Sequence, residues 1–142
     1  MPEGSAVTLE FKSSWDIEWD WDYGFVLTTT DGSAFTSQPS ENGYTTENAY
    51  NPNRSGCFAE LNNGLTGTSG AWQAGEPTVT TARLPEVTDY SHGAPFLADS
   101  YDISELAGQP EDAVRFSYYT DGAFDRPGWF IDDLVVKVDG TP

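Results

Sequence analysis

Apolar and polar side chains alternate strictly in the N-terminal part of the chain. From Val7 to Leu27 all odd positions but one carry an apolar or aromatic residue, and the even positions up to 22 are polar or charged. A period of two is typical of a β-strand with one buried face. Because this run is longer than an ordinary strand, we expect a break at 19–22 and two strands at about 7–18 and 23–30.

The C-terminal third alternates in the same way after a turn-rich middle. Residues 31–80 hold several Gly, Asn and Pro clusters typical of loops, with short strands possible at Trp72 and Val79. Residues 102–108 predict one helical turn between an Asp cap and a Gly stop. Residues 114–120 and 128–138 predict two further strands. The pattern predicts an all-β protein, a sandwich of two antiparallel sheets with one short helical turn, forming a single domain over residues 1–142.

Charge excludes several classes of protein. Six Lys and Arg face 23 Asp and Glu, for a net charge of −17. Such a chain would repel nucleic acid and anionic membrane surfaces, and we expect neither a nucleic-acid partner nor membrane insertion. Aromatic residues make up 14% of the chain, enough to build a core at this length. The start of the sequence has no export signal, and we interpret the chain as a piece of a longer protein.

Four acidic residues alternate with aromatic ones before and within the expected break: Asp16, Glu18, Asp20 and Asp22. On a strand they would share one face, and in water neighbouring carboxylates repel by only about 0.6 kcal/mol. A solvated acidic face is therefore one interpretation. A site for a hard divalent cation such as Ca²⁺ is the other, because such ions prefer carboxylate oxygens.

Asp132 and Asp133 interrupt the apolar last strand. Asp132 has the parity of Phe130, Leu134 and Val136 and is therefore expected to face inward. A buried carboxylate needs a compensating charge or hydrogen bonds. Arginine, backbone N–H groups or a Ca²⁺ ion could supply them, and the scarcity of basic residues favours the ion.

Other residues offer little for catalysis. The chain has one His, His92, so an H-E-x-x-H zinc motif is absent. Its one Cys, Cys57, could form a dyad with His92, although a structural thiol in a loop is the simpler interpretation. Exposed aromatic residues could instead stack on sugar rings: Trp19, Trp21, Trp72 and Tyr50. Trp15 is expected in the core, because it continues the apolar face.

Several blocks together resemble the accessory domain of immune inhibitor A peptidases, which are secreted bacterial zinc metallopeptidases. The similar blocks are 9–32, 63–70, 101–108, 114–121 and 126–134. The ending Ile131-Asp-Asp-Leu134 is also similar to MAM domains and other jelly rolls. In this family a further strand precedes the block that begins at Leu9. This chain lacks that strand, so one edge of the sandwich is expected to be open or trimmed.

The resemblance implies a jelly-roll accessory domain beside the zinc site of a secreted protein, with structural Ca²⁺. Its ligands would be Asp16, Glu18, Asp22, Asp132 and Asp133. The expected function is to position substrate or to pack on the catalytic domain, with no catalysis by this chain. The partner is then that catalytic domain, or an extracellular protein or glycan. A carbohydrate-binding module that uses the exposed Trp and Tyr residues is the alternative.

Overall fold

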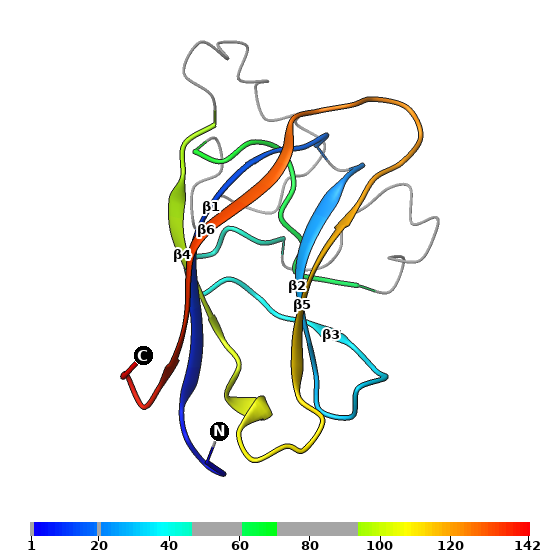
Figure 1. Ribbon diagram of the computed structural model, residues 1–142. Coiled ribbons are helices and arrows are strands. Elements are labelled where there is room, and N and C mark those ends of the chain that lie inside the picture. The colour runs from blue at the N-terminus through cyan, green and yellow to red at the C-terminus, as the bar shows by residue number, and fades with distance from the viewer. Residues whose placement is uncertain (1, 20, 47–60, 71–93) are drawn as a thin grey trace.

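Six β-strands and one short 3-10 turn form the part of the chain that the computed structural model describes, residues 2–19, 21–46, 61–70 and 94–142 (Figure 1). No helix in these ranges is both long and apolar enough to span a bilayer. The strands are β1 (Val7–Asp16), β2 (Tyr23–Thr29), β3 (Thr36–Ser37), β4 (Leu97–Asp102), β5 (Ala113–Tyr119) and β6 (Gly128–Val138), and the turn is η2 (Ser104–Leu106).

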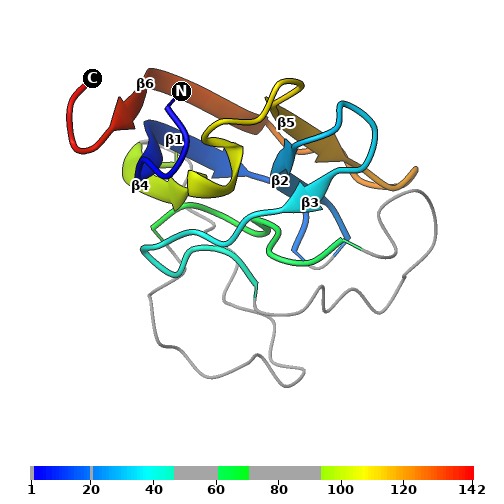
Figure 2. The ribbon, with the colours of Figure 1, turned by 90° about the horizontal axis from the view of Figure 1, so that it is seen from below.

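The strands form two antiparallel sheets that pack face to face. One sheet has the order β4-β1-β6 and the other β3-β2-β5. The chain crosses from one sheet to the other after β1, β3, β4 and β5, and the sheets form two layers in both views (Figures 1 and 2). This confirms the expected β-sandwich.

The predicted elements match the observed ones closely. The two strands expected at 7–18 and 23–30 are β1 and β2, and the last two expected strands are β5 and β6. Asp102 accepts hydrogen bonds from Ser104 N at 2.9 Å and Ser104 Oγ at 2.6 Å, and thereby fixes the start of η2. The strands suggested at Trp72 and Val79 lie outside the described residues.

The core between the sheets is built by the odd positions of β1. Val7, Leu9 and Phe11 are buried together with Val26 of β2 and Tyr101 of β4. The Phe11 ring stacks on the Tyr101 ring at 5.4 Å between centroids and meets the Phe116 ring edge-on at 5.4 Å. Trp15 is fully buried, as the alternation predicts.

A β-bulge in β6 overturns the expected inward position of Asp132. Before the bulge Asp132 lies opposite Lys12, and after it Val135 lies opposite Glu10. Asp133, at the bulge, has a positive φ of 53°. The extra residue reverses the alternation, so Val136 faces inward opposite Leu9. Asp132 and Phe130 lie on the outer face and are exposed.

Candidate acidic site at the end of β1

A loop at residues 65–70 is hydrogen-bonded to both the C-terminal end of β1 and the N-terminal end of β2. Gly24 and Leu65 exchange backbone hydrogen bonds of 2.9 and 2.8 Å, Ile17 N donates to Gly67 O at 2.9 Å, and Ser69 N donates to Trp15 O at 2.8 Å. Gly67 has a φ of 73°, and a Cβ there would lie 3.0 Å from the Trp19 ring. The loop therefore holds the residues that follow β1 close to the start of β2, where several acidic side chains meet.

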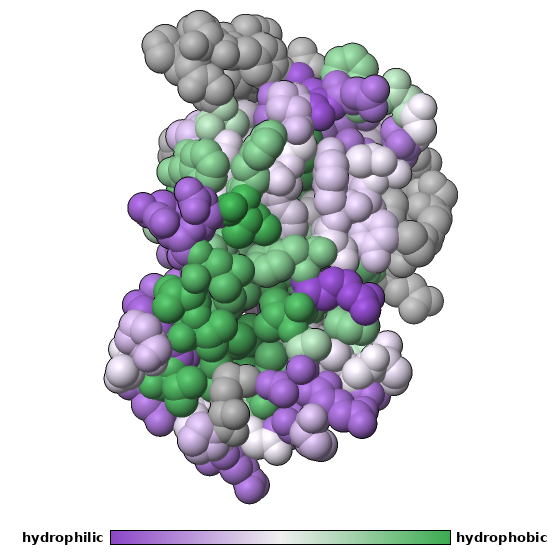
Figure 3. Space-filling view, in the orientation of Figure 1, coloured by the Kyte–Doolittle hydropathy of each residue, from purple (hydrophilic) through white to green (hydrophobic). Residues whose placement is uncertain are grey.

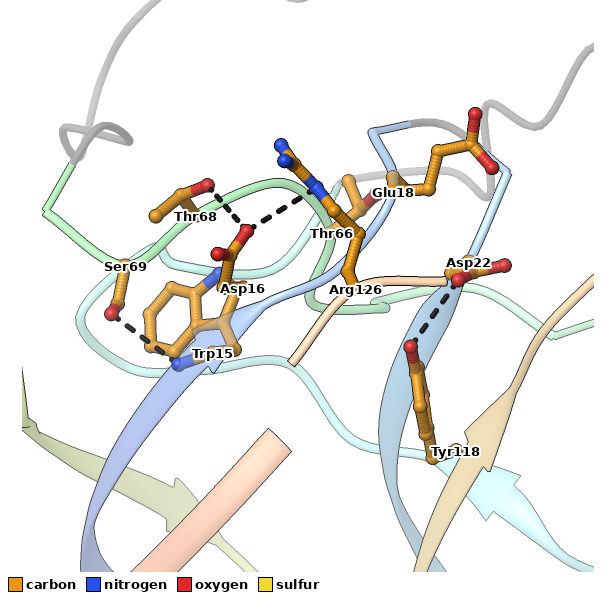
Figure 4. Close-up of polar contacts among 9 residues, drawn as sticks. All are labelled: Trp15, Asp16, Glu18, Asp22, Thr66, Thr68, Ser69, Tyr118 and Arg126. Atoms are coloured by element: carbon orange, nitrogen blue, oxygen red, sulfur yellow. Dashed lines mark hydrogen bonds and ion pairs between the residues drawn. The ribbon is translucent and has the colours of Figure 1, made fainter. Parts of the chain in front are cut away.

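Asp16 is buried and paired with the guanidinium of Arg126. Arg126 Nε lies 3.4 Å from Asp16 Oδ1, and the two side chains are 14% and 5% exposed. The same oxygen accepts a hydrogen bond from Thr68 Oγ1 at 3.3 Å, and Figure 4 shows both contacts converging on it. The compensating group for the buried Asp16 is thus an arginine, whereas the alternation suggests a solvated acidic face or a cation site at this position.

Asp22 is also buried and ties β2 to the end of β5. Its Oδ2 accepts the Tyr118 hydroxyl at 3.2 Å, as Figure 4 shows. Its Oδ1 accepts the backbone N–H of Asp121 at 3.0 Å. Burial raises the pKa of Asp22 above its ordinary value, although these hydrogen bonds oppose the rise. Burial, followed by the charge of Asp22, raises the pKa of Tyr118, so this hydroxyl stays protonated as a donor.

Glu18, Asp22 and Asp121 form an acidic cluster in which one carboxylate oxygen of each residue lies within 4.8 Å of those of the other two. Asp22 N donates to Glu18 O at 3.1 Å, which closes a tight turn and brings these two side chains to the same end of the sandwich. Asp121 follows β5, ninety-nine positions further along the chain. The donor set consists of hard oxygens and contains no His or Cys, which fits Ca²⁺ better than zinc.

Asp132 and Asp133 lie away from this cluster, alongside the middle of β1. Asp133 Oδ2 lies 2.8 Å from Lys12 Nζ, and both side chains are exposed. This hydrogen bond and the charge of Asp133 raise the pKa of Lys12. Asp132 Oδ1 accepts the backbone N–H of Asp133 at 2.8 Å. Of the five predicted ligands, only Glu18 and Asp22 therefore lie in the acidic cluster. Asp20, the fourth acid of the alternating run, lies outside the described residues.

The acid that does face the interior is Asp99 of β4, which the sequence analysis missed. It lies opposite Phe11, and its Oδ1 accepts hydrogen bonds from Ser40 Oγ at 2.6 Å and Asn42 Nδ2 at 3.3 Å. Burial raises the pKa of Asp99. The alternation of Leu97, Asp99 and Tyr101 was the available signal for an inward acid. Asp121 was missed because an Asp-Gly pair after a strand indicates a turn first.

The candidate sugar-stacking residues are only partly described. Trp19 is half-buried over Gly67, and Trp21 is 36% exposed. Trp72 and Tyr50, like Cys57 and His92, lie outside the described residues. Stacking of these aromatic side chains on sugars stays a prediction.

Comparison with known proteins gives one consistent match. Two curated relatives, both described as pre-pro-metalloprotease PrtV, come from Vibrio cholerae serotype O1 strains M66-2 and ATCC 39315 / El Tor Inaba N16961. Each is 29% identical to this chain over 141 residues, which is 99% of the chain and 11% of the relative. No protein-family profile matches the chain, and no solved structure matches it. The chain is thus a β-sandwich similar to a small region of a metalloprotease precursor.

Proposed function

We propose that this chain is a non-catalytic accessory domain of an extracellular metallopeptidase of the immune inhibitor A type. The observation that carries the proposal is the likeness over nearly the whole chain to a region that makes up 11% of a metalloprotease precursor. The residue blocks similar to immune inhibitor A peptidases point to the same class. In such a protein the domain packs on the catalytic domain or positions substrate beside it.

The contacts of the acidic residues support a structural role for this end of the sandwich. Asp16 is paired with Arg126, and Asp22 accepts hydrogen bonds from Tyr118 and from the backbone of Asp121. These contacts join β1, β2 and the segment between β5 and β6. These contacts fix the segments that follow β1 and β5, and they use carboxylate oxygens of Asp16 and Asp22 as hydrogen-bond acceptors. Such a structural use of the carboxylates suits a domain that serves as a scaffold.

Calcium is the second part of the proposal. Glu18, Asp22 and Asp121 would hold the ion, since each offers one carboxylate oxygen and these three oxygens lie within 4.8 Å of one another. Three carboxylates this close repel one another, and a divalent cation would relieve the repulsion. The ion would supply charge compensation and would tie the start of β2 to the end of β5.

Deletion of the domain from the parent enzyme tests the accessory role. We expect the parent without residues 1–142 to cleave a short fluorogenic peptide with a kcat/KM within about threefold of the intact enzyme, and a folded protein substrate at least tenfold more slowly. Peptide cleavage by the isolated 142-residue chain would contradict the proposal. So would a truncated enzyme that cleaves both substrates as fast as the intact enzyme and has the same thermal stability.

A further inference from the structure

We propose that Asn42 is a modification site, at which deamidation releases the covering segment, residues 38–45, from β4. This segment follows β3 and lies over the buried carboxylate of Asp99. The inference goes beyond the accessory role of the domain and does not depend on it. It follows from the Asn-Gly pair at 42–43, from the contacts of the Asn42 amide and from a second Asn-Gly pair that the fold restrains.

The side-chain amide of Asn42 holds the covering segment on β4. Its Nδ2 donates hydrogen bonds to Ala98 O at 3.1 Å and to Asp99 Oδ1 at 3.3 Å. Both contacts need an N–H donor at the Nδ2 position. The attachment of the segment to β4 therefore depends on position 42 remaining an amide.

The sequence at this position is the one in which an asparagine amide is lost most easily. Asn42 precedes Gly43, and both are exposed in a turn in which Gly43 N donates to Ser40 O at 3.1 Å. Asparagine is a thermolabile residue, and glycine has no Cβ to hinder the approach of its nitrogen to the preceding side chain.

Deamidation at this pair needs water as its only co-reactant. When the turn opens, Gly43 N loses its proton and attacks Cγ of Asn42. The new N–Cγ bond closes a succinimide ring, the Cγ–Nδ2 bond breaks, and Nδ2 leaves as ammonia. Water then opens the ring at one of its two carbonyl carbons, and the product at position 42 is aspartate or isoaspartate.

Either product converts the contact that holds the segment into one that repels it. A carboxylate oxygen takes the place of the donor that lies 3.3 Å from Asp99 Oδ1. Two carboxylates at such a distance repel each other, and the repulsion is stronger where water is excluded. Because ammonia is lost, the amide does not form again, and the release is a one-way change.

The second Asn-Gly pair in the sequence, Asn63-Gly64, is held in a way that opposes the same reaction. Gly64 is buried, and a Cβ there would lie 2.6 Å from the Tyr23 ring and 2.8 Å from the Phe25 ring. Gly64 N donates to Thr46 Oγ1 at 3.3 Å, and Gly64 O accepts Thr46 N at 3.0 Å. The attacking nitrogen is thus packed against β2, and its release requires more local unfolding than the exposed turn at Asn42.

Mass spectrometry of the folded 142-residue chain after incubation at mildly alkaline pH tests the modification. We expect Asn42 to deamidate at least about tenfold faster than Asn63, because its turn opens more easily. In guanidinium chloride the two sites should react at similar rates, and Asn42→Gln, which keeps an amide, should stay unmodified. Equal rates at Asn42 and Asn63 in the folded chain would overturn the inference. So would an intact Asn42 after a period in which the unfolded chain reacts completely.

The release itself needs a local probe rather than a hydrophobic dye. Figure 3 shows a hydrophobic area between the positions of β6 and β5, where a dye would bind whether or not the segment is released. The covering segment lies on the side of the molecule away from β6 (Figure 2). The Glu41 amide reports on this segment, because Glu41 N donates to Ser100 O of β4 at 2.9 Å.

Hydrogen exchange of the Glu41 amide tests the release. Asn42→Asp carries the charge of the product, and in this variant the amide should exchange at least about tenfold faster than in the unmodified chain. Gln109→Glu is the matched control, because it adds the same charge at an exposed position outside the segment and should leave the exchange unchanged. Unchanged exchange in Asn42→Asp, or an equal increase in the control, would overturn the release. Normal near-UV circular dichroism of both variants shows that the sandwich remains folded.

Discussion

Asp99 lies directly opposite Phe11 in the β4–β1 ladder, so its carboxylate occupies the interior face of the sandwich. The segment that follows β3 covers it, because Ser40 and Asn42 donate hydrogen bonds to its Oδ1. Its carboxylate also accepts the backbone N–H of Ser100 at 2.9 Å, and the buried Tyr101 hydroxyl lies beside it. Asp99 therefore joins two segments fifty-nine positions apart through a buried carboxylate that accepts hydrogen bonds but forms no ion pair among the described residues.

Removal of the Asp99 charge should weaken the pH dependence of stability. The folded-state pKa of Asp99 is raised above its ordinary value of 3.8, so the folded protein binds its proton more tightly than the unfolded chain does. Protonation of Asp99 therefore stabilises the folded state, and this stabilisation is fully present below pH 3.8. It is lost as the pH rises through the folded-state pKa of Asp99. Asp22 contributes in the same direction.

Urea unfolding of three variants between pH 4 and pH 8 measures this effect. Asp99→Asn keeps the acceptor oxygen. At pH 8 this variant should be at least as stable as the unmodified 142-residue chain, and its stability should depend less on pH. Asp99→Ala should lose about 1–3 kcal/mol, because the Ser40 and Asn42 donors lose their acceptor. The control Asp132→Asn changes an exposed acid and should leave the profile unchanged. A loss of stability in Asp99→Asn at pH 8 would show that the buried charge is itself required.

The Asp16–Arg126 pair should be strongly coupled. Both side chains are largely buried, so removal of either one leaves a charge without its counter-charge. We expect Arg126→Met to lose about 3 kcal/mol or more of unfolding free energy, while Asp16→Asn combined with Arg126→Met recovers part of it. Chemical denaturation of the two single variants and the double variant gives the coupling energy. A coupling below about 0.5 kcal/mol would show that solvent screens the pair as at an exposed site.

Calcium should raise the melting temperature of the chain. An ion present at 100 times its dissociation constant stabilises the folded state by about 2.7 kcal/mol. Differential scanning calorimetry at pH 7 in low salt, with CaCl₂ or with a chelator, measures the shift. Asp121→Asn should abolish it, whereas Asp125→Asn, an exposed acid outside the acidic cluster of Glu18, Asp22 and Asp121, should not. The same melting temperature with CaCl₂ and with chelator would remove calcium from the account.

The packing of β2 against β6 leaves no room for a side chain at Gly24. A Cβ added to Gly24 would lie 2.8 Å from the Trp129 ring, closer than real contacts allow. We expect Gly24→Ala to cost about 1–3 kcal/mol through displacement of the indole, with a change in tryptophan fluorescence. Gly122→Ala is the control, since no atom lies within 4 Å of its added Cβ. Equal stability of the two variants would show that Trp129 has another position available.

The sequence predicts β1, β2, β5 and β6 because their signal is local, whereas β3 and β4 were not expected. The alternation from Val7 to Leu27 reflects the burial of one face of β1, and it depends on no other part of the chain. The orientation of Asp132 could not be predicted in this way, because a one-residue bulge at Asp133 reverses the alternation. Nothing in the composition of β6 distinguishes this bulge from a regular strand.

Only two of the three residues of the acidic cluster were predicted from the sequence, for a similar reason. Glu18 and Asp22 are close in sequence, and their regular spacing suggested a shared site. Asp121 joins them only because β2 pairs with β5, a contact between residues about one hundred positions apart. Arg126 reaches Asp16 across a similar distance in sequence. Single-sequence patterns contain no information on such pairings.

Binding of the isolated 142-residue chain to the parent enzyme from which this domain has been deleted tests the central claim most directly. Isothermal titration calorimetry should show one-to-one association with a dissociation constant in the micromolar range or below, because an accessory domain that packs on its parent retains complementary surfaces when the two are separated. The complete absence of binding, together with unchanged cleavage of folded protein by the truncated enzyme, would contradict the account.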